Sequence, residues 1–468
     1  MTTNLELALT TAFIAVVSAA LSVTFGVPFG SWLASLKPKS QRVVGAVTVV
    51  PFLLPPLLIG IAALPITSML EVDSRIGILL IVLAHAFMNI GFVGRVVAGS
   101  AVPLEQVEAA RLEGASDAII RRELQLPQQV PAIVGAALLV ALYSATSFGL
   151  VLLVSGGRVR TLETEIAEAA LYRLDLNQAA VLALLQTILT IALFAVSRRF
   201  TGMGFQLDQL GRSPLRPSPV SRLVGYVYTT LVVFAFAQIL VRALDGATLF
   251  SNFSNLGSQG TRSLLNISVV DATVNSGRNM LVVLFISLTL AYLLAGRSKQ
   301  SLLVLLPIGV SSVVIGLGAL ILSGYLPREL SSSWLLVPIV QSLVAIPLAY
   351  QILRPARKSF DSEVLDAAKI DGAGFFASLT RIEIPLLRKP LTTAVAFVGM
   401  SSIGEFGAAS FLAFGSQETL PIVMFRLASR PGSENFGMAM AAGAIYILLT
   451  AWIVWLSSKP SRIQRQEQ

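Results

Sequence analysis

The chain contains the stretch Glu108-Ala109-Ala110, then Gly114, then Leu124-Gln125-Leu126-Pro127. The same arrangement recurs 258 positions later with every spacing kept, as Asp366-Ala367-Ala368, then Gly372, then Ile382-Glu383-Ile384-Pro385. Both copies lie in polar stretches between long apolar runs. A loop that is duplicated in this way predicts two equivalent surfaces for two equivalent partners.

The composition predicts an all-α polytopic membrane protein. Of the 468 residues, 55% are hydrophobic and 13% are charged, whereas charged residues make up about 25% of a soluble domain. The apolar residues form blocks of about 20 or more, which is long enough to cross a hydrocarbon layer of ~30 Å. The net charge of +9 is explained by charges in the loops between these blocks, so no nucleic-acid partner is expected.

The apolar blocks predict eleven membrane-spanning segments. The first is expected to be a retained span, because the residues before it carry no Lys or Arg and lack the basic start of a signal peptide. The Pro-rich stretch at 51–64 is a candidate for a broken helix. The eleven segments are expected at about 8–33, 43–66, 77–100, 130–154, 178–197, 220–242, 276–296, 301–324, 334–354, 390–414 and 436–457.

The distribution of Lys and Arg predicts the orientation. If the N-terminus is outside, most of these residues fall in loops on the cytoplasmic side, as the positive-inside rule requires. The reverse orientation would break this rule at almost every short loop. We therefore expect the C-terminus and both copies of the repeated loop to be cytoplasmic.

The duplication extends beyond the loop and predicts two halves. Upstream, Pro51 and Ile59-Gly60 recur as Pro307 and Ile315-Gly316. Downstream, Ser144 and Phe148-Gly149 recur as Ser402 and Phe406-Gly407. We expect a first half at 1–200 with five spans, a cytoplasmic linker at 201–219 and a second half at 220–468 with six. The halves would then have the same orientation, related by an axis along the membrane normal.

Each repeated loop predicts a helix, a break at glycine, a short second helix and a proline before the next span. A short helix along the membrane surface could fit a groove on a cytoplasmic partner. Alternatively, the Gly and Pro residues only shape the return of the chain into the membrane. The identical spacing of two copies favours the docking interpretation.

The repeated motif resembles the EAA loop of the permease subunits of ATP-binding cassette importers. The likeness covers nearly the whole chain, and a single chain with two such halves resembles the fused permeases of thiamine and iron(III) importers. The second copy departs from the pattern because Asp366 replaces the usual Glu. The first half also departs, with five expected spans where such permeases typically have six.

The resemblance implies that each loop is a coupling helix that docks in a cleft of an ATPase subunit. The matching residues are Glu108, Ala109, Ala110 and Gly114 in the first copy and Asp366, Ala367, Ala368 and Gly372 in the second. It further implies two copies of a cytoplasmic ATPase, an extracytoplasmic substrate-binding protein and a location in the cell membrane of a prokaryote.

No catalytic or cofactor site is expected on this chain. It contains no Gly-x4-Gly-Lys-Ser/Thr stretch that could cradle phosphates, so ATP and Mg²⁺ would bind to the partner ATPase. It has one histidine, His85, and no cysteine, which excludes a metal site with several imidazoles. A packing role is the favoured interpretation of His85.

Glu405 is the clearest acidic residue within a predicted span, and such residues usually face a protein interior or water. Alternatively, it only bonds a neighbouring helix. Asn89 and Gln341 are weaker candidates, because polar contacts between helices explain them equally well. The segment around Glu405 aligns with 143–149, and we hypothesise that the two segments line the translocation path. The path candidates are Ser144, Ser147, Phe148, Ser402, Glu405 and Phe406.

The leading hypothesis is therefore the permease subunit of an ATP-driven importer. Thiamine is the favoured substrate because its positive charge suits a path with one carboxylate. Iron(III) or another small solute is the alternative, although iron(III) prefers several hard oxygen ligands. A secondary transporter driven by an ion gradient is the alternative class, and a membrane enzyme is disfavoured because paired catalytic groups are missing.

Overall fold

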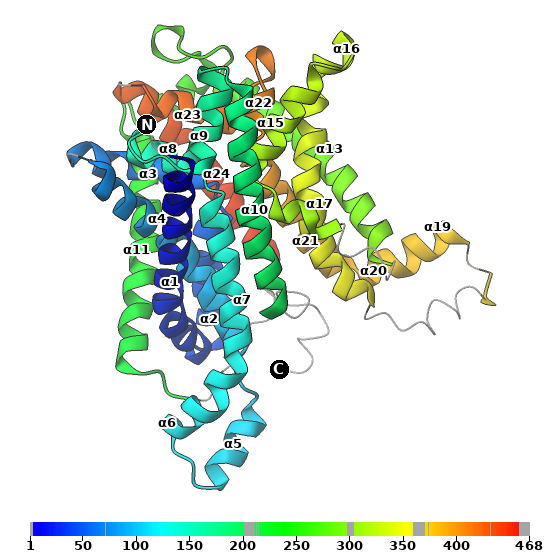
Figure 1. Ribbon diagram of the computed structural model, residues 1–468. Helices are drawn as coiled ribbons and strands as arrows, with labels where there is room; N and C mark the ends of the chain where they lie inside the picture. Colours follow the sequence, from blue (N-terminus) through cyan, green and yellow to red (C-terminus); the bar gives the residue numbers. More distant parts are fainter. Residues whose placement is uncertain are drawn as a thin grey trace.

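The computed structural model describes residues 3–70, 72–200, 211, 213, 215–296, 304–358, 370–372, 374–430 and 432–457. Within these ranges the chain forms helices joined by turns and contains no strand. Most of the helices gather into one bundle, and the hairpin of α5 and α6 protrudes from the end opposite the N-terminus (Figure 1). This confirms the predicted all-α class.

The first half begins with a long helix that is closed at its N-terminus by a capping box between Thr3 and Glu6. Its helices are α1 (Asn4–Ser35), α2 (Pro38–Leu53), α3 (Pro56–Met69), α4 (Ser74–Gly99), α5 (Leu104–Leu112), α6 (Asp117–Ile119), the π-helix η1 (Ile120–Gln125), α7 (Leu126–Ala145), α8 (Gly149–Ser155), α9 (Leu162–Ala167), the π-helix η2 (Glu168–Tyr172) and α10 (Leu176–Phe200).

The second part of the chain begins with α11, which Ser218 caps through the backbone N–H of Ser221. Its helices are α11 (Pro219–Leu244), α12 (Ser251–Ser254), η3 (Asn255–Gly257), η4 (Thr261–Ser263), α13 (Val269–Ala295), η5 (Leu306–Gly309), α15 (Ser312–Ser323), α16 (Arg328–Ser331), α17 (Leu336–Lys358), α19 (Phe375–Ser378), the π-helix η6 (Leu379–Glu383), α20 (Ile384–Leu386), α21 (Arg388–Ile403), α22 (Ala409–Leu412), η7 (Gly415–Gln417), α23 (Leu420–Ala428) and α24 (Ser433–Ser457).

Eight helices of the described residues are long and apolar enough to cross a membrane, or nine if α2 and α3 are counted as one broken span. About eleven spans were expected over the whole chain, and the described part provides eight or nine long ones together with shorter apolar helices such as α15. Three expected spans are interrupted. In 304–324 the chain forms η5 and a separate α15 of 12 residues, and in 390–414 α21 ends at Ile403, before Gly404. The segment 130–154 is likewise divided, between α7 and α8.

The predicted break in the Pro-rich stretch is present. Helix α2 ends before Pro55 and Pro56, and α3 continues at an angle of 90°. Proline has no backbone N–H and its ring clashes with the preceding turn, so two successive prolines end one helix and begin the next. In the second half, the position equivalent to this break is the turn between η5 and α15.

The two halves repeat the same packing, which gives structural support to the duplication. Helices α1, α4 and α7 pack against one another, and so do α13, α17 and α21 at the equivalent positions. Gly60 of α3 lies against Leu150 and Leu153, while Gly316 of α15 lies against Ala408 and Phe411 at the same offsets. The small side of each glycine lets the two helices approach closely.

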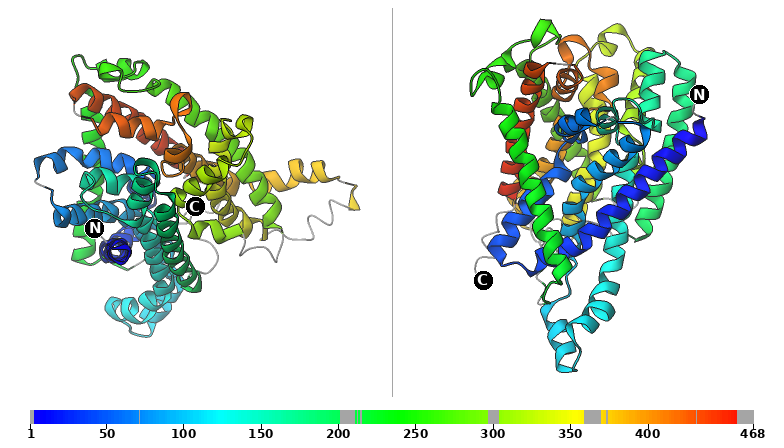
Figure 2. Two further views of the ribbon diagram at one scale, coloured as in Figure 1. Left: turned by 45° about the horizontal axis from the view of Figure 1, so that its top comes forward. Right: turned by 90° about the vertical axis from the view of Figure 1, so that its left-hand side faces the viewer.

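The halves also exchange contacts across their boundary. Helix α10 of the first half packs on η5 and α15, and α24 of the second half packs on α2 and α3. The single extra helix, α11, packs on α1 and α2 as well as on α24. Two further views show these helices interleaved within one bundle (Figure 2). One large core cluster accordingly contains residues of both halves, from Leu7 to Ile447.

Candidate functional site

The first repeated loop forms a hairpin that projects from the bundle. Helix α5 ends at Leu112, Glu113 is its C-cap residue, and Gly114 follows with φ +85°. The Ala115 N–H donates to the Ala110 carbonyl at 3.0 Å, and the Gly114 N–H donates to the Arg111 carbonyl at 3.0 Å. These two bonds are the Schellman arrangement, which needs a left-handed residue and therefore favours glycine. The predicted break at Gly114 is thus present.

The inner face of this hairpin has a small core of its own. Val102, Val107 and Ile120 are buried there, and Ala110 and Leu124 pack against them. Leu215, from the segment between the halves, completes the same cluster. Arg121 also donates to the Arg216 carbonyl at 2.8 Å, so this segment fastens the hairpin to the bundle. The Arg111–Asp117 ion pair at 2.9 Å joins α5 to α6.

The outer face of the hairpin is exposed. Glu108 and Ala109 of the motif lie on it, and the Leu112 side chain is 90% exposed. Leu104 and Ile119 are also exposed large apolar residues of the same hairpin. An apolar tip of this kind, held by a turn of fixed geometry, is suited to contact a partner.

Around its glycine, the second repeated loop can be compared with the first at residues 370–372. Asp366, Ala367 and Ala368 lie outside the described residues. Gly372 has φ +80°, close to the value at Gly114, and apart from the adjacent residues no described atom lies within 4 Å of a Cβ placed at either glycine. Ile370, the counterpart of Leu112, is 86% exposed. The two loops therefore share the glycine geometry and the exposed aliphatic residue.

Downstream of each glycine the chain passes through a π-helix, η1 in the first half and η6 in the second. Each π-helix ends on a buried polar residue, Gln125 or Glu383. Glu383 accepts a hydrogen bond from the Tyr292 hydroxyl at 2.5 Å and pairs with Arg357 at 3.5 Å. These bonds tie the second loop to α13 and α17, beside the span that follows it.

The two predicted path segments meet where the halves join. The Phe148 and Phe406 rings are stacked, with centroids 5.2 Å apart and planes 17° from parallel. Because these residues occupy equivalent positions, their contact lies on the approximate two-fold axis. Ser144 and Ser147 are buried nearby in sequence, and within the described residues neither hydroxyl has a hydrogen-bond partner. The predicted juxtaposition of the segments is present.

Glu405 is buried and has partners for both oxygens. One oxygen accepts from the Ala408 N–H at 2.7 Å and the other from the Ala409 N–H at 3.0 Å, so the carboxylate caps the start of α22. Gln341 also lies 3.5 Å from it and accepts from the Ser402 hydroxyl at 3.3 Å. These contacts directly support the alternative interpretation of Glu405, in which it only bonds neighbouring helices of the bundle.

The other polar candidates make local contacts. Asn89 donates to the His85 carbonyl one turn earlier at 2.7 Å. His85 is buried, and its Nδ1 lies 3.4 Å from the Ser18 hydroxyl. Among the described residues no group of three or more His, Cys, Asp or Glu side chains could hold a metal ion. His85 and Asn89 thus lie in the packing between α1 and α4.

Glu163 is a buried acid that the sequence interpretation missed. The segment from Thr161 to Ile166 lies between the expected spans 130–154 and 178–197, which places it on the outer side in the expected orientation. The chain folds there into α9, and Leu162, Glu163 and Ile166 are buried. The capping pattern at Thr161 could have indicated this helix. Its burial depends on contacts of α9 with α10 and with α15 of the other half, which local sequence does not report.

The described residues form a helical bundle of two repeated halves with eight or nine helices that are long and apolar enough to cross a membrane, which is the architecture of a polytopic membrane protein. The family of binding-protein-dependent transport system inner membrane components matches the chain twice, at residues 26–203 and 281–458. The chain belongs to this family. It is thus a multi-pass inner membrane permease, a class that transports solutes and does not catalyse a reaction.

Among curated proteins, the chain is similar to thiamine transport system permease proteins. It is 25% identical to ThiP of Brucella abortus over 479 residues, which covers 93% of this chain and 84% of that protein. It is 25% identical to ThiP of Escherichia coli over 80% of this chain and 71% of that protein. A shorter likeness, 28% over 117 residues, is to the probable transport system permease protein NifC of Clostridium pasteurianum.

Proposed function

We propose that this chain forms the path by which thiamine is imported across the inner membrane, powered by separate ATPase subunits. Support for thiamine comes from the similarity to ThiP proteins over 93% of the chain. The buried acid Glu405 on the candidate path also suits a positively charged substrate. ATP and Mg²⁺ would bind to the ATPase and not to this chain.

The two loops carry the proposed coupling. Leu112 and Ile370 are exposed at equivalent places, each two residues before a glycine in the left-handed conformation. Two such tips on one chain suit two copies of a cytoplasmic ATPase subunit. The motif residues Glu108, Ala109, Ala110 and Gly114, with Asp366, Ala367, Ala368 and Gly372, would form the docking surfaces. This repeated exposed tip is the observation that best supports coupling to a partner.

The orientation follows from the same proposal. Both loops and the C-terminus would be cytoplasmic, and the N-terminus would be outside, as the charge distribution indicates. An extracytoplasmic binding protein would deliver the substrate to the opposite face. The stacked pair Phe148 and Phe406 would act as a constriction between these two faces, with Ser144, Ser147, Ser402 and Glu405 supplying polar contacts beside it.

Iron(III) is the competing substrate, and uptake measurements separate the two. In a strain that lacks this gene, thiamine uptake should be lost while iron uptake stays at the wild-type rate, and the gene on a plasmid should restore thiamine uptake. Loss of iron uptake alone would assign iron(III) instead. Uptake that survives without ATP but requires an ion gradient would contradict the ATP-driven class.

A further inference from the structure

Glu163 is a fully buried carboxyl at the boundary between the halves. It lies in the first turn of α9, its residue is 0% exposed, and α9 packs on α10 of its own half and on α15 of the other half. The Ser311 hydroxyl, from the turn before α15, lies beside the Glu163 carboxyl. Groups from both halves therefore surround this acid.

Gln186 holds one oxygen of Glu163, whereas the other makes no direct hydrogen bond within the described residues, with the Ser311 hydroxyl beside the carboxyl. The Gln186 amide of α10 donates to Glu163 Oε1 at 2.6 Å and to the Ala145 carbonyl at 2.9 Å. Glu163 Oε2 has no hydrogen-bond partner within the described residues, and no ion pair of Glu163 is found there. Through Gln186, the acid is connected to the backbone beside the path residues Ser144 and Ser147.

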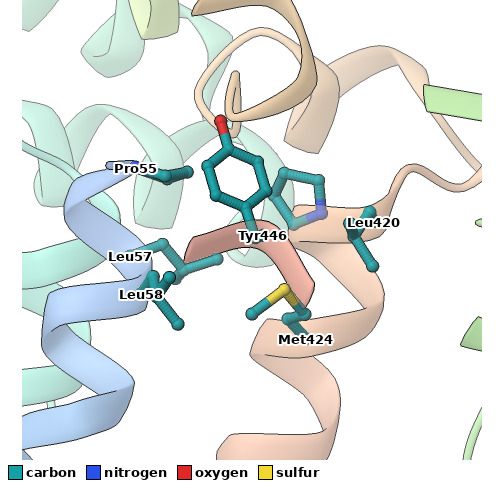
Figure 3. A pocket seen from close by; sticks show the side chains of 7 residues that line it. Pro55, Leu57, Leu58, Leu420, Met424 and Tyr446 are labelled. Carbon is teal, nitrogen blue, oxygen red and sulfur yellow. The ribbon is translucent and has the colours of Figure 1, made fainter. Parts of the chain in front are cut away.

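The equivalent place in the other half contains no acid. Position 421 corresponds to Glu163 and is Pro421, position 444 corresponds to Gln186 and is Ala444, and Pro55 corresponds to Ser311. Pro55 and Pro421 line a small apolar pocket together with Leu57, Leu58 and Leu420 (Figure 3). At one of these two equivalent places the halves meet through the polar residues Glu163, Gln186 and Ser311. At the other they meet through Pro55, Pro421 and the neighbouring apolar side chains.

This comparison argues that the fold does not require a carboxyl at position 163. An unpaired buried carboxyl opposes folding, because its charge or its proton loses water without gaining a full set of partners. Glu405 differs, since backbone N–H groups occupy both of its oxygens. An acid retained at such a cost within a membrane bundle is explained by a role in transport.

We infer that Glu163, positioned by Gln186, is a binding residue for a cationic substrate as it passes between the two halves. The inference rests on the proposed function and extends it, because it places the charge that selects the cation on the first half. The oxygen Oε2, which makes no hydrogen bond within the described residues, supplies the contact. Thiamine and a ferric ion are the two sources of such a positive charge.

The test measures uptake and ATP hydrolysis together in proteoliposomes that contain the permease, its ATPase and the binding protein. For Glu163→Gln, kcat/KM for thiamine uptake should fall about tenfold, which corresponds to loss of about 1.4 kcal/mol of binding. ATP hydrolysis stimulated by the loaded binding protein should remain. Glu163→Asp should restore part of the uptake, and Glu168→Gln, an exposed acid after the same helix, should behave as wild type.

Three results would overturn the inference: wild-type thiamine uptake by Glu163→Gln, a parallel fall in uptake and hydrolysis, or an equal effect of Glu168→Gln. Should Glu163→Gln not be recovered from membranes, Gln186→Ala replaces it, since Ala444 occupies the equivalent position; unchanged uptake would then overturn the inference. The same defect when ferric ion, delivered by its binding protein, replaces thiamine would support the site with an inorganic cation. Absence of uptake by the wild-type protein would contradict the proposed function instead.

Discussion

Gly114 and Gly372 show most clearly what single residues contribute. Both have left-handed backbone angles, and among the described residues no non-adjacent atom lies within 4 Å of a Cβ placed at either position. The cost of a substitution there would therefore come from the backbone and not from a clash. A left-handed conformation costs about 1–2 kcal/mol for most residues, while Asn tolerates it.

Gly114→Val is accordingly expected to loosen the end of α5 and to lower thiamine uptake relative to ATP hydrolysis. Gly114→Asn should retain most of the uptake, because the turn survives. Gly257→Val is a matched control, since that glycine also faces open space but has no left-handed angle. Equal uptake by Gly114→Val and wild type would show that the turn does not matter for coupling.

Glu405→Gln is a second test at this scale. The amide keeps one acceptor oxygen, so one of the two N–H groups at Ala408 and Ala409 would lose its partner. A buried N–H without a partner costs about 1–3 kcal/mol, and the thermal unfolding midpoint of the purified protein should fall. A variant with both normal stability and normal transport would remove both roles from Glu405.

The sequence predicted these residues to different degrees. Gly114, Phe148 and Phe406 were predicted because each belongs to the repeat, and a repeat reports geometry that both halves need. Glu163 has no counterpart in the repeat, since Pro421 stands in its place. Its burial arises from tertiary contacts of α9 with α10 of its own half and with α15 of the other, which no local pattern could indicate.

At the scale of elements, the first loop and the segment between the halves behave as one unit. Leu215 is buried in the hairpin core, and the Ser213 N–H donates to the Ala34 carbonyl at 3.0 Å. This segment was predicted as a plain linker. Its role as a support for α5 and α6 depends on one apolar side chain among glycines and prolines, which composition alone does not show.

Leu215→Ala should therefore weaken the first hairpin. Losing most of one buried leucine side chain costs about 2 kcal/mol, so amide hydrogen exchange across α5 and α6 should become faster. Exchange at 374–386 in the second half should not change. Val220→Ala is the control, because Val220 is close in sequence but exposed; the same acceleration in both variants would contradict this role of Leu215.

The helices also show why the prediction of membrane spans from hydropathy was incomplete. Hydropathy identified the apolar blocks correctly, but it cannot tell a straight helix from one that is broken inside the bundle. Pro55 and Pro56 break one block by 90°, and Gly404 ends α21 within another. Such breaks persist where neighbouring helices satisfy the freed backbone groups, as Glu405 does for Ala408 and Ala409.

At the scale of the whole molecule, the halves are interleaved, and the stacked rings of Phe148 and Phe406 mark their axis. The chain has no cysteine, so a Phe148→Cys, Phe406→Cys double variant would carry only two thiols. A short, reducible bifunctional thiol reagent should link them and abolish uptake, and a reductant should restore it. Unchanged uptake by the linked protein would show that these segments do not separate during transport.

The central claim is that the two equivalent loops dock two ATPase subunits, and it is tested by placing charges on their exposed tips. Leu112→Arg and Ile370→Arg should leave the fold intact because both side chains are exposed. The measurement is copurification of the ATPase with the double variant, with Tyr325→Arg, another strongly exposed residue, as control. We predict that ATPase binding falls about tenfold or more, a loss of at least ~1.4 kcal/mol, and that the control binds normally. Wild-type binding and uptake by the double variant would contradict the account.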